Sequence, residues 1–412
     1  MTPTRRPVRC RGRSIIEPVT DLATRVDTAR APLLRRAAPA LLGYAAVRAL
    51  GLLVLAVWSA ARGKSAYTLL TARWDSLWYT RVAGLGYGYE VRLPNGDVHS
   101  NLAFFPLLPW LERLGHALAP LSYADAGFAV SLLASVAAAA GIFAVADRVY
   151  GPRVGLCAVL LWAVLPVGIV QSMAYSESLF TALAAWSLYA VLTGRWVSAG
   201  ALAALAGLTR PVGLAVVAAV WTAGVVSFVR ERGTRHAPGA HHHERTPVRR
   251  RALGMLLAPL GAAGYVLWVG RRTGRGPLGY LDVQAGWRNG FDGGYAFARF
   301  VADKFTSFPS ALAGVGLITG VALLIWLYVT GVRGRQPVVL LVYTGVVLAL
   351  ALCASSYFGS KPRLLMPAFP VLLPLAGALA RLRTSRSALV IAGLAVVAAV
   401  YGAFWLNGSG PP

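Results

Sequence analysis

Charged side chains are scarce in this chain. Of its 412 residues only 13% are Asp, Glu, Lys or Arg, whereas a soluble domain carries about 25%. Hydrophobic residues make up 57% of the chain, and the mean hydropathy is +0.60. This composition excludes a soluble domain of useful size. Apolar runs of about 20 residues recur instead, and a helix of that length crosses the hydrocarbon core of a bilayer.

Acidic residues and cysteines are also few. The chain has 15 Asp and Glu against 40 Lys and Arg, so its net charge is +25. On a soluble protein this excess would indicate a nucleic-acid partner. Here the basic residues lie mostly in short runs between apolar segments, which is the pattern of the positive-inside rule, and we expect no nucleic acid. Cys10, Cys157 and Cys353 show neither metal-ligand spacing nor a disulfide framework.

The apolar pattern predicts an all-α polytopic membrane protein with about 10 to 12 transmembrane helices, because a chain in lipid must satisfy its backbone hydrogen bonds internally. The strand alternation of a barrel is absent from the sequence. We expect spanning helices at residues 38–60, 126–147, 154–174, 178–194, 196–209, 212–229, 252–270, 309–330, 336–354, 364–380 and 387–406.

The basic loops predict which parts of the chain lie on each side of a cell membrane. Residues 1–37 form a basic cytoplasmic tail, residues 38–406 the transmembrane domain, and residues 407–412 a short C-terminal tail on the outer side. The His- and Arg-rich loop 230–251 is cytoplasmic, and a flexible linker is favoured there over a metal site.

Two long loops are expected on the outer side, at residues 61–125 and 271–308. The first contains the apolar segment 102–120, which also holds Pro106, Pro109, Glu112 and Arg113. A span there would reverse the side of every later loop, so we predict a re-entrant or interfacial helix. Most of the few carboxylates fall on the outer side, and a carboxylate at the membrane is by default a functional candidate. We therefore expect extracytoplasmic chemistry.

The first outer motif is TARWDSLWYTRVAGLGYGYE at residues 71–90. Its tryptophans and aliphatic residues share one helical face, which predicts an amphipathic helix lying flat on the outer membrane surface. Asp75 stands at its start, after Arg73 and Trp74. An alternative stays open, in which Asp75 is only a helix N-cap and the tryptophans are only an aromatic belt.

Two further motifs combine apolar and polar residues. HSNLAFFPLLPW contains Phe105 and Pro106 and is typical of an interfacial helix stiffened by prolines. AYSES places Tyr175, Ser176 and Glu177 between two apolar runs, at the outer end of a predicted helix hairpin. Helix capping by Ser176, with Glu177 in the first turn, is the alternative to a functional role.

The candidate cations lie in three other segments. Arg210, in GLTRPVGL, is either an anion site beside a helix break or an anchor that extends to the interface. YLDVQAGWRNG, in the second outer loop, carries Gln284 and Trp287. SYFGSKPRLLMPAFP carries Lys361 and Arg363, for which interfacial anchoring is the alternative. Carboxylates, cations and aromatics on one side of the membrane suit group transfer from a phosphate-bearing lipid to a hydroxyl acceptor.

In chain order, WDSLWYTRVAGLGY, NLAFFPLLPWL, AYSESLFTAL and TRPVGL resemble the PIG-V type mannosyltransferases and their bacterial relatives, within the GT-C class of polytopic glycosyltransferases. The resemblance covers roughly residues 40–380, and QAGW and PRLLMP are also similar to the family. It implies a GT-C-like fold with amphipathic helices in the first outer loop. It also implies a polyprenyl-phosphate-linked sugar donor, a mannosyl donor above all, and Asp75 as the catalytic acidic residue. The resemblance does not identify the acceptor of this chain, which is left open as a glycan, a lipid or a protein.

Elementary chemistry supports a mechanism with one carboxylate. The phosphate of such a donor is already a good leaving group, so Asp75 needs only to act as general base on the acceptor hydroxyl. Glycoside hydrolysis, by contrast, normally uses a second carboxyl as acid. A single displacement inverts the anomeric centre. Cations stabilise the departing phosphate, with Arg363 as first choice, followed by Arg210 and Lys361.

The remaining candidates are assigned to binding. Glu177 and Ser176 would shape the acceptor or sugar pocket, and Gln284 and Trp287 would contact the sugar or the lipid head group. No metal or other cofactor is expected. The competing function is a lipid or glycan transporter or flippase, whose signs are internal repeats and charges at mid-membrane, and we find no repeat in the sequence. A non-catalytic scaffold is a third class, which would not need Asp75.

Overall fold

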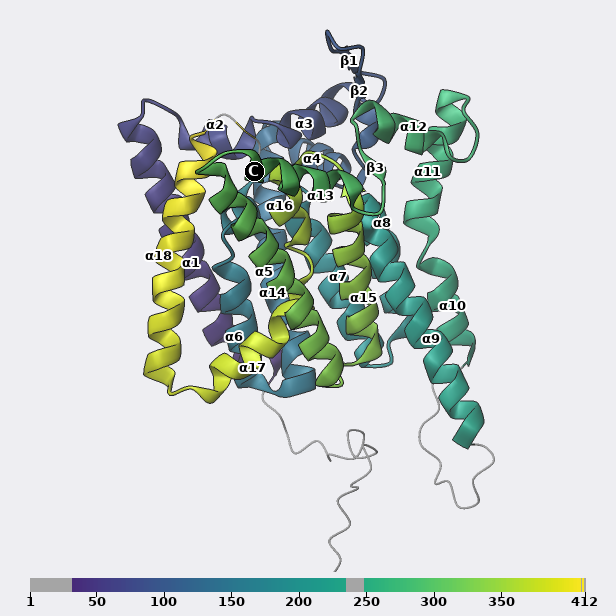
Figure 1. Cartoon of the computed structure of the whole chain (residues 1–412). Coiled ribbons are helices and arrows are strands. Elements are labelled where there is room, and N and C mark those ends of the chain that lie inside the picture. Colours follow the sequence, from purple (N-terminus) through teal and green to yellow (C-terminus); the bar gives the residue numbers. More distant parts are fainter. Residues whose placement is uncertain (1–31, 235–247, 409, 411–412) are drawn as a thin grey trace, which may run out of the picture.

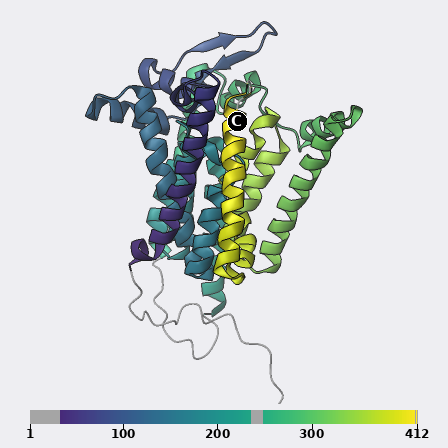
Figure 2. The same cartoon turned by 90° about the vertical axis from the view of Figure 1, so that its left-hand side faces the viewer.

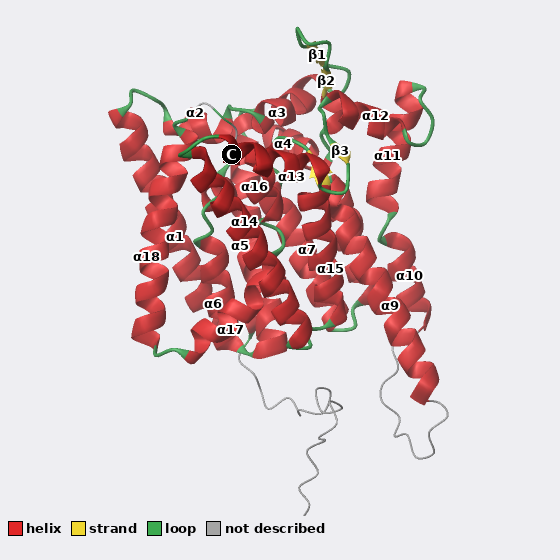
Figure 3. Ribbon diagram, viewed as in Figure 1, coloured by secondary structure: helices red, strands yellow, loops and turns green. Residues whose placement is uncertain are grey.

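A computed structural model of the chain describes residues 32–234, 248–408 and 410. Cys10 and most of the predicted basic tail and His-rich loop therefore lie outside the described residues. Figure 1 shows a bundle of helices that run between two ends of the molecule, with a small hairpin projecting from one end. Figure 3 shows that helices make up most of this described part.

Six helices of the described chain are long and apolar enough to cross a membrane, namely α1 (Leu33–Ala61), α5 (Tyr123–Tyr150), Pro211–Arg232, Val248–Thr273, α14 (Ser310–Arg333) and α18 (Thr384–Leu406). Four shorter apolar helices are α6 (Pro152–Ala163), α7 (Glu177–Leu192), α8 (Trp196–Gly207) and α15 (Val338–Cys353). A seventh candidate span is a bent pair of helices described below. Each predicted span overlaps one of these elements, so the all-α, multi-pass prediction is confirmed.

Three spans are less regular than predicted, and prolines explain the differences. The predicted helix 154–174 ends at Ala163, because Pro166 lacks the N–H group that a continuing helix needs. The chain resumes as η2 (Gly168–Ser172). Pro259 likewise divides the predicted helix 252–270 into α10 (Val248–Leu257) and α11 (Leu260–Thr273).

The predicted span 364–380 is the bent pair. Its first arm, Phe358–Leu365, contains η5 (Phe358–Ser360) and α16 (Lys361–Leu365), and its second arm, Phe369–Arg381, contains η6 (Phe369–Leu372) and α17 (Leu373–Arg381). The arms meet at 74°. Pro367 and Pro370 lie at the bend. The bend leaves Arg363 on a short arm rather than on a continuous helix.

Short helices gather at one end of the bundle, which we call the outer end (Figures 1 and 2). They are α2 (Ala66–Thr71), α3 (Asp75–Leu85), η1 (Asn101–Ala103), α4 (Leu107–Leu118), α12 (Gly279–Gly286), α13 (Tyr295–Ala302) and η4 (Asp303–Thr306). All belong to the two predicted long loops. The segment 102–120 contains α4, which has 12 residues and is not among the helices of the described chain that are long and apolar enough to span.

Two small antiparallel sheets were not predicted. Strands β1 (Glu90–Arg92) and β2 (Val98–Ser100) form the projecting hairpin, whose turn contains Asn95-Gly96 with Gly96 at φ +88°. Strand β3 (Gly290–Phe291) pairs with β4 (Ala354–Ser355). The second sheet fastens the second outer loop to the end of α15, and so holds that loop close to the bent pair.

Alanine and valine are frequent among the buried side chains of the core, and some helices touch through their backbones. α8 contacts α10 and α11. A methyl group placed on Gly261 would collide with the carbonyl of Ala204, and Gly200 and Gly254 meet in the same way. Small residues of this kind let membrane helices approach closely. The helix that follows α8, α9 (Leu214–Thr234), begins after η3 (Pro211–Gly213), and Arg210 lies at this break.

Candidate active site

Asp75 is the first residue of α3 at the outer end, and its carboxylate does not cap that helix. The N-cap residue is Trp74, and no side-chain capping bond is present. Instead, Nη1 of Arg363 donates a hydrogen bond of 2.6 Å to Oδ2 of Asp75. About a quarter of the Asp75 side chain, 26%, remains exposed. The carboxylate therefore faces a cation on one side and stays accessible on another.

The backbone before Asp75 is held in an uncommon conformation. Trp74 has a φ of +52°, a region that side-chain-bearing residues rarely adopt. The surrounding contacts fix this turn: the Ser76 hydroxyl donates to the Arg73 carbonyl at 2.6 Å, and the Arg73 guanidinium lies 4.0 Å from the Trp74 ring centroid. Such conformations cost free energy and cluster at functional sites. Here the turn sets the direction in which the Asp75 side chain leaves the helix.

Glu177 is the first residue of α7 and is almost completely buried. Its side chain is 1% exposed and forms an ion pair with Arg210 and a second one, of 3.2 Å, with Nε of Arg363. Ser176, the N-cap residue, makes no capping bond. Its hydroxyl is instead 2.7 Å from the Tyr79 hydroxyl. The capping alternative for Ser176 is therefore wrong.

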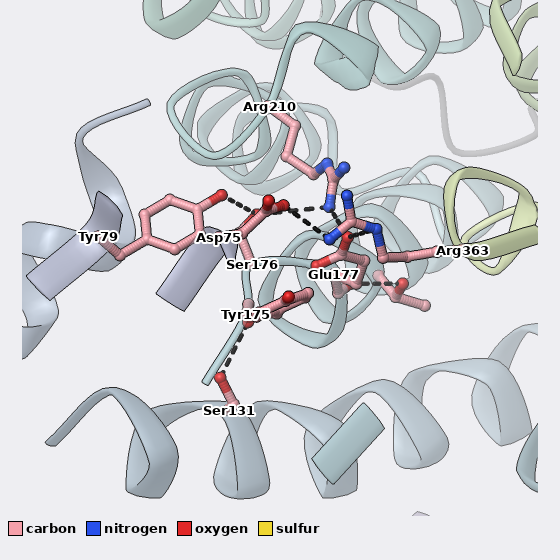
Figure 4. A network of polar contacts seen from close by, with 9 residues as sticks. Asp75, Tyr79, Ser131, Tyr175, Ser176, Glu177, Arg210 and Arg363 are labelled. Carbon is pink, nitrogen blue, oxygen red and sulfur yellow. Dashed lines mark hydrogen bonds and ion pairs between the residues drawn. The ribbon is translucent and has the colours of Figure 1, made fainter. Parts of the chain in front are cut away.

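Figure 4 shows the resulting network, in which four charged side chains from distant segments converge. Asp75 comes from α3, Glu177 from α7, Arg210 from the break after α8, and Arg363 from the short arm of the bent pair. Two carboxylates are balanced by two guanidinium groups. A buried carboxylate is tolerated only when it is paired, so the two arginines explain how Glu177 can lie inside the bundle. We call these four residues the charge network.

Two neutral side chains support the charge network, and the sequence did not reveal either. Tyr79 lies one helical turn after Asp75 and contacts Ser176. Burial raises the pKa of Tyr79, so its hydroxyl stays protonated and available for hydrogen bonding. Ser131 of α5 donates to the carbonyl of Tyr175 at 2.9 Å. The spacing of four residues between Asp75 and Tyr79 was the available signal, because such residues share a helix face.

The other predicted residues serve different contacts. Phe105 is buried, with its ring 4.4 Å from that of Tyr265, and Pro106 precedes α4. The Lys361 ammonium donates to the carbonyls of Ala351 and Ala354 at 2.7 and 2.8 Å. These carbonyls end α15, where a cation is favourable. Lys361 thus caps a helix and is committed to backbone oxygens.

Trp287 joins the two outer loops, whereas the hydrogen bonds of Gln284 stay within the second loop. Gln284 donates to the Tyr280 hydroxyl. Nε1 of Trp287 donates to the Ser100 carbonyl at 3.0 Å, and the Trp287 ring stacks 4.0 Å from His99. Within the described residues, no three His, Cys, Asp or Glu side chains gather into a group that could hold a metal ion.

The comparisons with known proteins agree with this architecture. Residues 101–238 match the family model "Dolichyl-phosphate-mannose-protein mannosyltransferase". Two curated relatives, both named GPI alpha-1,6-mannosyltransferase 2, from Mus musculus and Rattus norvegicus, are 31% identical over 153 residues, which is 35% of this chain. The match spans 29% of the length of each relative.

A solved structure extends the likeness to most of the chain. ArnT from Cupriavidus metallidurans, bound to undecaprenyl phosphate, superposes with a TM-score of 0.51 at 18% identity, and the alignment covers 86% of this chain and 63% of ArnT. At this identity the likeness concerns the fold alone. The chain is therefore a multi-pass membrane protein with the GT-C fold of polytopic glycosyltransferases, as its sequence motifs predicted.

Proposed function

We propose that the chain is a membrane glycosyltransferase that uses a polyprenyl-phosphate-linked donor. The matched family and the two curated relatives carry mannosyltransferase names, and ArnT was solved with a polyprenyl phosphate bound. These likenesses support mannose as the sugar that is transferred. They leave the acceptor open as a hydroxyl on a glycan, a lipid or a protein.

The observation that carries this proposal is the different exposure of the two carboxylates. Glu177 is buried and held by two guanidinium groups, whereas Asp75 is 26% exposed and held by one. A general base must reach the proton that it removes. Of these two carboxylates, Asp75 is the one that an acceptor hydroxyl can approach, so Asp75 is the catalytic base of the proposed reaction.

The proposed reaction is a single displacement. Asp75 takes the proton of the acceptor hydroxyl, and the acceptor oxygen attacks the anomeric carbon of the sugar. The bond between that carbon and the phosphate oxygen breaks, and polyprenyl phosphate leaves with the bonding electrons. Arg363, and behind it Arg210, offset the negative charge that grows on the phosphate. The configuration at the anomeric carbon inverts.

Asp75→Asn tests the proposal directly. We expect transfer from radiolabelled polyprenyl-phosphate-mannose to membrane acceptors to fall by about 10²- to 10⁴-fold, the usual contribution of a general base. Glu90→Gln is the matched control, because Glu90 is an exposed carboxylate on β1 and should keep wild-type transfer. Equal transfer by Asp75→Asn, at equal protein abundance, would remove Asp75 from the mechanism.

A second donor tests which sugar the protein transfers. Polyprenyl-phosphate-glucose is offered in the same membranes, and the mannose proposal expects little label to leave it. Consumption of the glucosyl donor in preference to the mannosyl donor would overturn mannose as the sugar and leave the transferase proposal in place. If wild type consumes neither donor in acceptor-rich membranes, the transferase proposal fails and a lipid or glycan transporter becomes the better explanation.

A further inference from the structure

The proposed base and the proposed phosphate ligand are bound to each other. Nη1 of Arg363 donates to Oδ2 of Asp75 at 2.6 Å. A carboxylate that accepts a charge-assisted hydrogen bond from arginine is a poorer acceptor for the proton of a hydroxyl. A guanidinium that donates to a carboxylate is also less available to a phosphate. In this state neither residue can act fully in the proposed reaction.

Arg363 is held from a second side that does not involve Asp75. Its Nε lies 3.2 Å from the Glu177 carboxylate, and its guanidinium carbon lies 5.0 Å from the Tyr175 ring centroid. Only 8% of the Arg363 side chain is exposed. Figure 4 shows Arg363 between the two carboxylates. Arg363 would therefore keep its place if the contact with Asp75 were broken.

The charges of the network determine which contact a new anion would replace. The two carboxylates and two guanidinium groups balance, and the phosphodiester of a lipid-linked sugar adds one negative charge. Glu177 is buried and shared by both arginines, so moving it would leave an unpaired carboxylate in the interior, which is costly. Asp75 is the more exposed partner. Asp75 is therefore the carboxylate whose ion pair with Arg363 can break, after which its side chain can turn toward water or a hydroxyl.

We propose that the contact between Asp75 and Arg363 is a latch that the phosphate of the donor opens. The phosphate takes the Nη1 hydrogen bond of Arg363, and Asp75 is released as the base only when the donor is in place. Glu177 is a positioning residue that holds Arg363 before and after this exchange. The latch rests on the proposed function and adds a binding order to it, with the donor before deprotonation of the acceptor.

Binding of a sugar-free probe tests the latch without requiring catalysis. The dissociation constant of a short-chain polyprenyl phosphate is measured for purified wild type, Asp75→Asn and Glu90→Gln. Because Asp75 competes with the phosphate for Arg363, Asp75→Asn should bind the probe about tenfold more tightly, a usual size for coupling between two binding events. Glu90→Gln loses the same charge at an exposed position and should bind like wild type.

Arg363→Gln completes the comparison. Alone it should weaken probe binding, and added to Asp75→Asn it should abolish the gain. Thermal unfolding of each variant checks that it is folded, and Asp75→Ser provides a second way to remove the competing charge. Binding by folded Asp75→Asn and Asp75→Ser that is equal to or weaker than wild type overturns the latch. An equal gain in Glu90→Gln also overturns it, because the effect is then one of overall charge.

The transfer assay separates the two proposals. If wild type transfers sugar and the Asp75 variants bind the probe no more tightly, the latch fails and the transferase proposal stands. If wild type neither binds the probe nor consumes a polyprenyl-phosphate sugar, both proposals fail together.

Discussion

Asp75, Glu177 and Glu112 are three carboxylates near the outer end of one bundle, and their surroundings give them three different states. Asp75 is partly exposed beside one arginine, and Glu177 is buried between two. Glu112, on α4, is fully buried, and both of its carboxyl oxygens lack a hydrogen-bond partner among the described residues. An unpaired buried carboxylate is costly, so the neutral acid is favoured.

Because its surroundings are apolar and closely packed, ionisation of Glu112 would destabilise the folded protein. Its carboxyl packs against Gly127 of α5, where an added methyl group would meet it. Burial raises the pKa of Glu112 to about 9 from its ordinary value of 4.5. The folded protein therefore keeps this proton up to about pH 9, whereas the unfolded chain releases it above about pH 4.5. Between these values, raising the pH favours the unfolded chain.

We predict that Glu112→Gln removes this pH dependence. Wild type should lose stability on the order of 3 kcal/mol between pH 5 and pH 8, and the variant should lose much less. The apparent melting temperature in detergent, followed from pH 4.5 to 8.5, measures both. Parallel curves for wild type and Glu112→Gln would show that Glu112 is ionised in the folded protein.

At this scale the sequence identified the charge network only in part. Asp75, Glu177, Arg210 and Arg363 were all candidates, because charged residues in apolar segments are rare. Which residues pair was not predictable, since Arg363 and Asp75 are 288 positions apart. Lys361 and Arg363 are nearly adjacent in the sequence, and no local pattern showed that Lys361 caps α15 while Arg363 enters the site.

At the scale of helices, each apolar segment that was predicted to span overlaps a helix of the structure. The hydropathy pattern did not predict the breaks within those helices, which position the site. Averaging over a window of about 20 residues passes over single prolines, so residues 154–174, 252–270 and 364–380 were predicted as continuous helices. Pro166, Pro259 and the pair Pro367 and Pro370 accompany the breaks. The short strands were missed for the opposite reason, because two or three residues are too few for an alternation to be visible.

The contact between α8 and α11 provides a test of helix packing with an internal control. Gly261→Ala would place a methyl group against the Ala204 carbonyl, whereas a methyl group at Gly264, one turn further along α11, meets nothing within 4 Å. We expect Gly261→Ala to destabilise the protein by about 1–3 kcal/mol. Gly264→Ala should be neutral or stabilise by up to about 1 kcal/mol.

Thermal unfolding of the two glycine variants in the same detergent separates the steric effect at Gly261 from the general effect of replacing a helix glycine by alanine. If both variants shift the melting temperature equally, the close approach of α8 and α11 is not a stabilising contact. If Gly261→Ala alone unfolds earlier, transfer activity of the folded fraction shows whether the break at Arg210, which follows α8, has also moved.

For the molecule as a whole, the sequence predicted that the outer loops carry the chemistry. Asp75 is the first residue of α3 and Arg363 lies on α16, and Figure 1 shows both helices toward the end of the bundle where the loop helices gather. We propose that this end faces away from the cytoplasm across the cell membrane, since the short basic loops belong to the opposite end.

Site-specific cysteines test this orientation. In a variant without the native cysteines, Glu90→Cys on the hairpin and Ser385→Cys at the opposite end are both exposed positions. A membrane-impermeant maleimide added to intact cells should label position 90 and spare position 385 until the cells are lysed. The reverse pattern would place the charge network on the cytoplasmic side and exclude the proposed outer-face reaction.

The separation of Asp75 and Arg363 along the chain also has a consequence for biosynthesis. Glu177 and Arg210 belong to neighbouring helices and can meet soon after both leave the ribosome, but Arg363 follows Asp75 by 288 residues. Until the bent pair is inserted, the membrane holds two carboxylates against one guanidinium. Unpaired charge at the membrane is costly. A nascent chain that stops before the bent pair therefore has no Arg363 to pair with Asp75, and insertion of the bent pair completes the charge balance of the network.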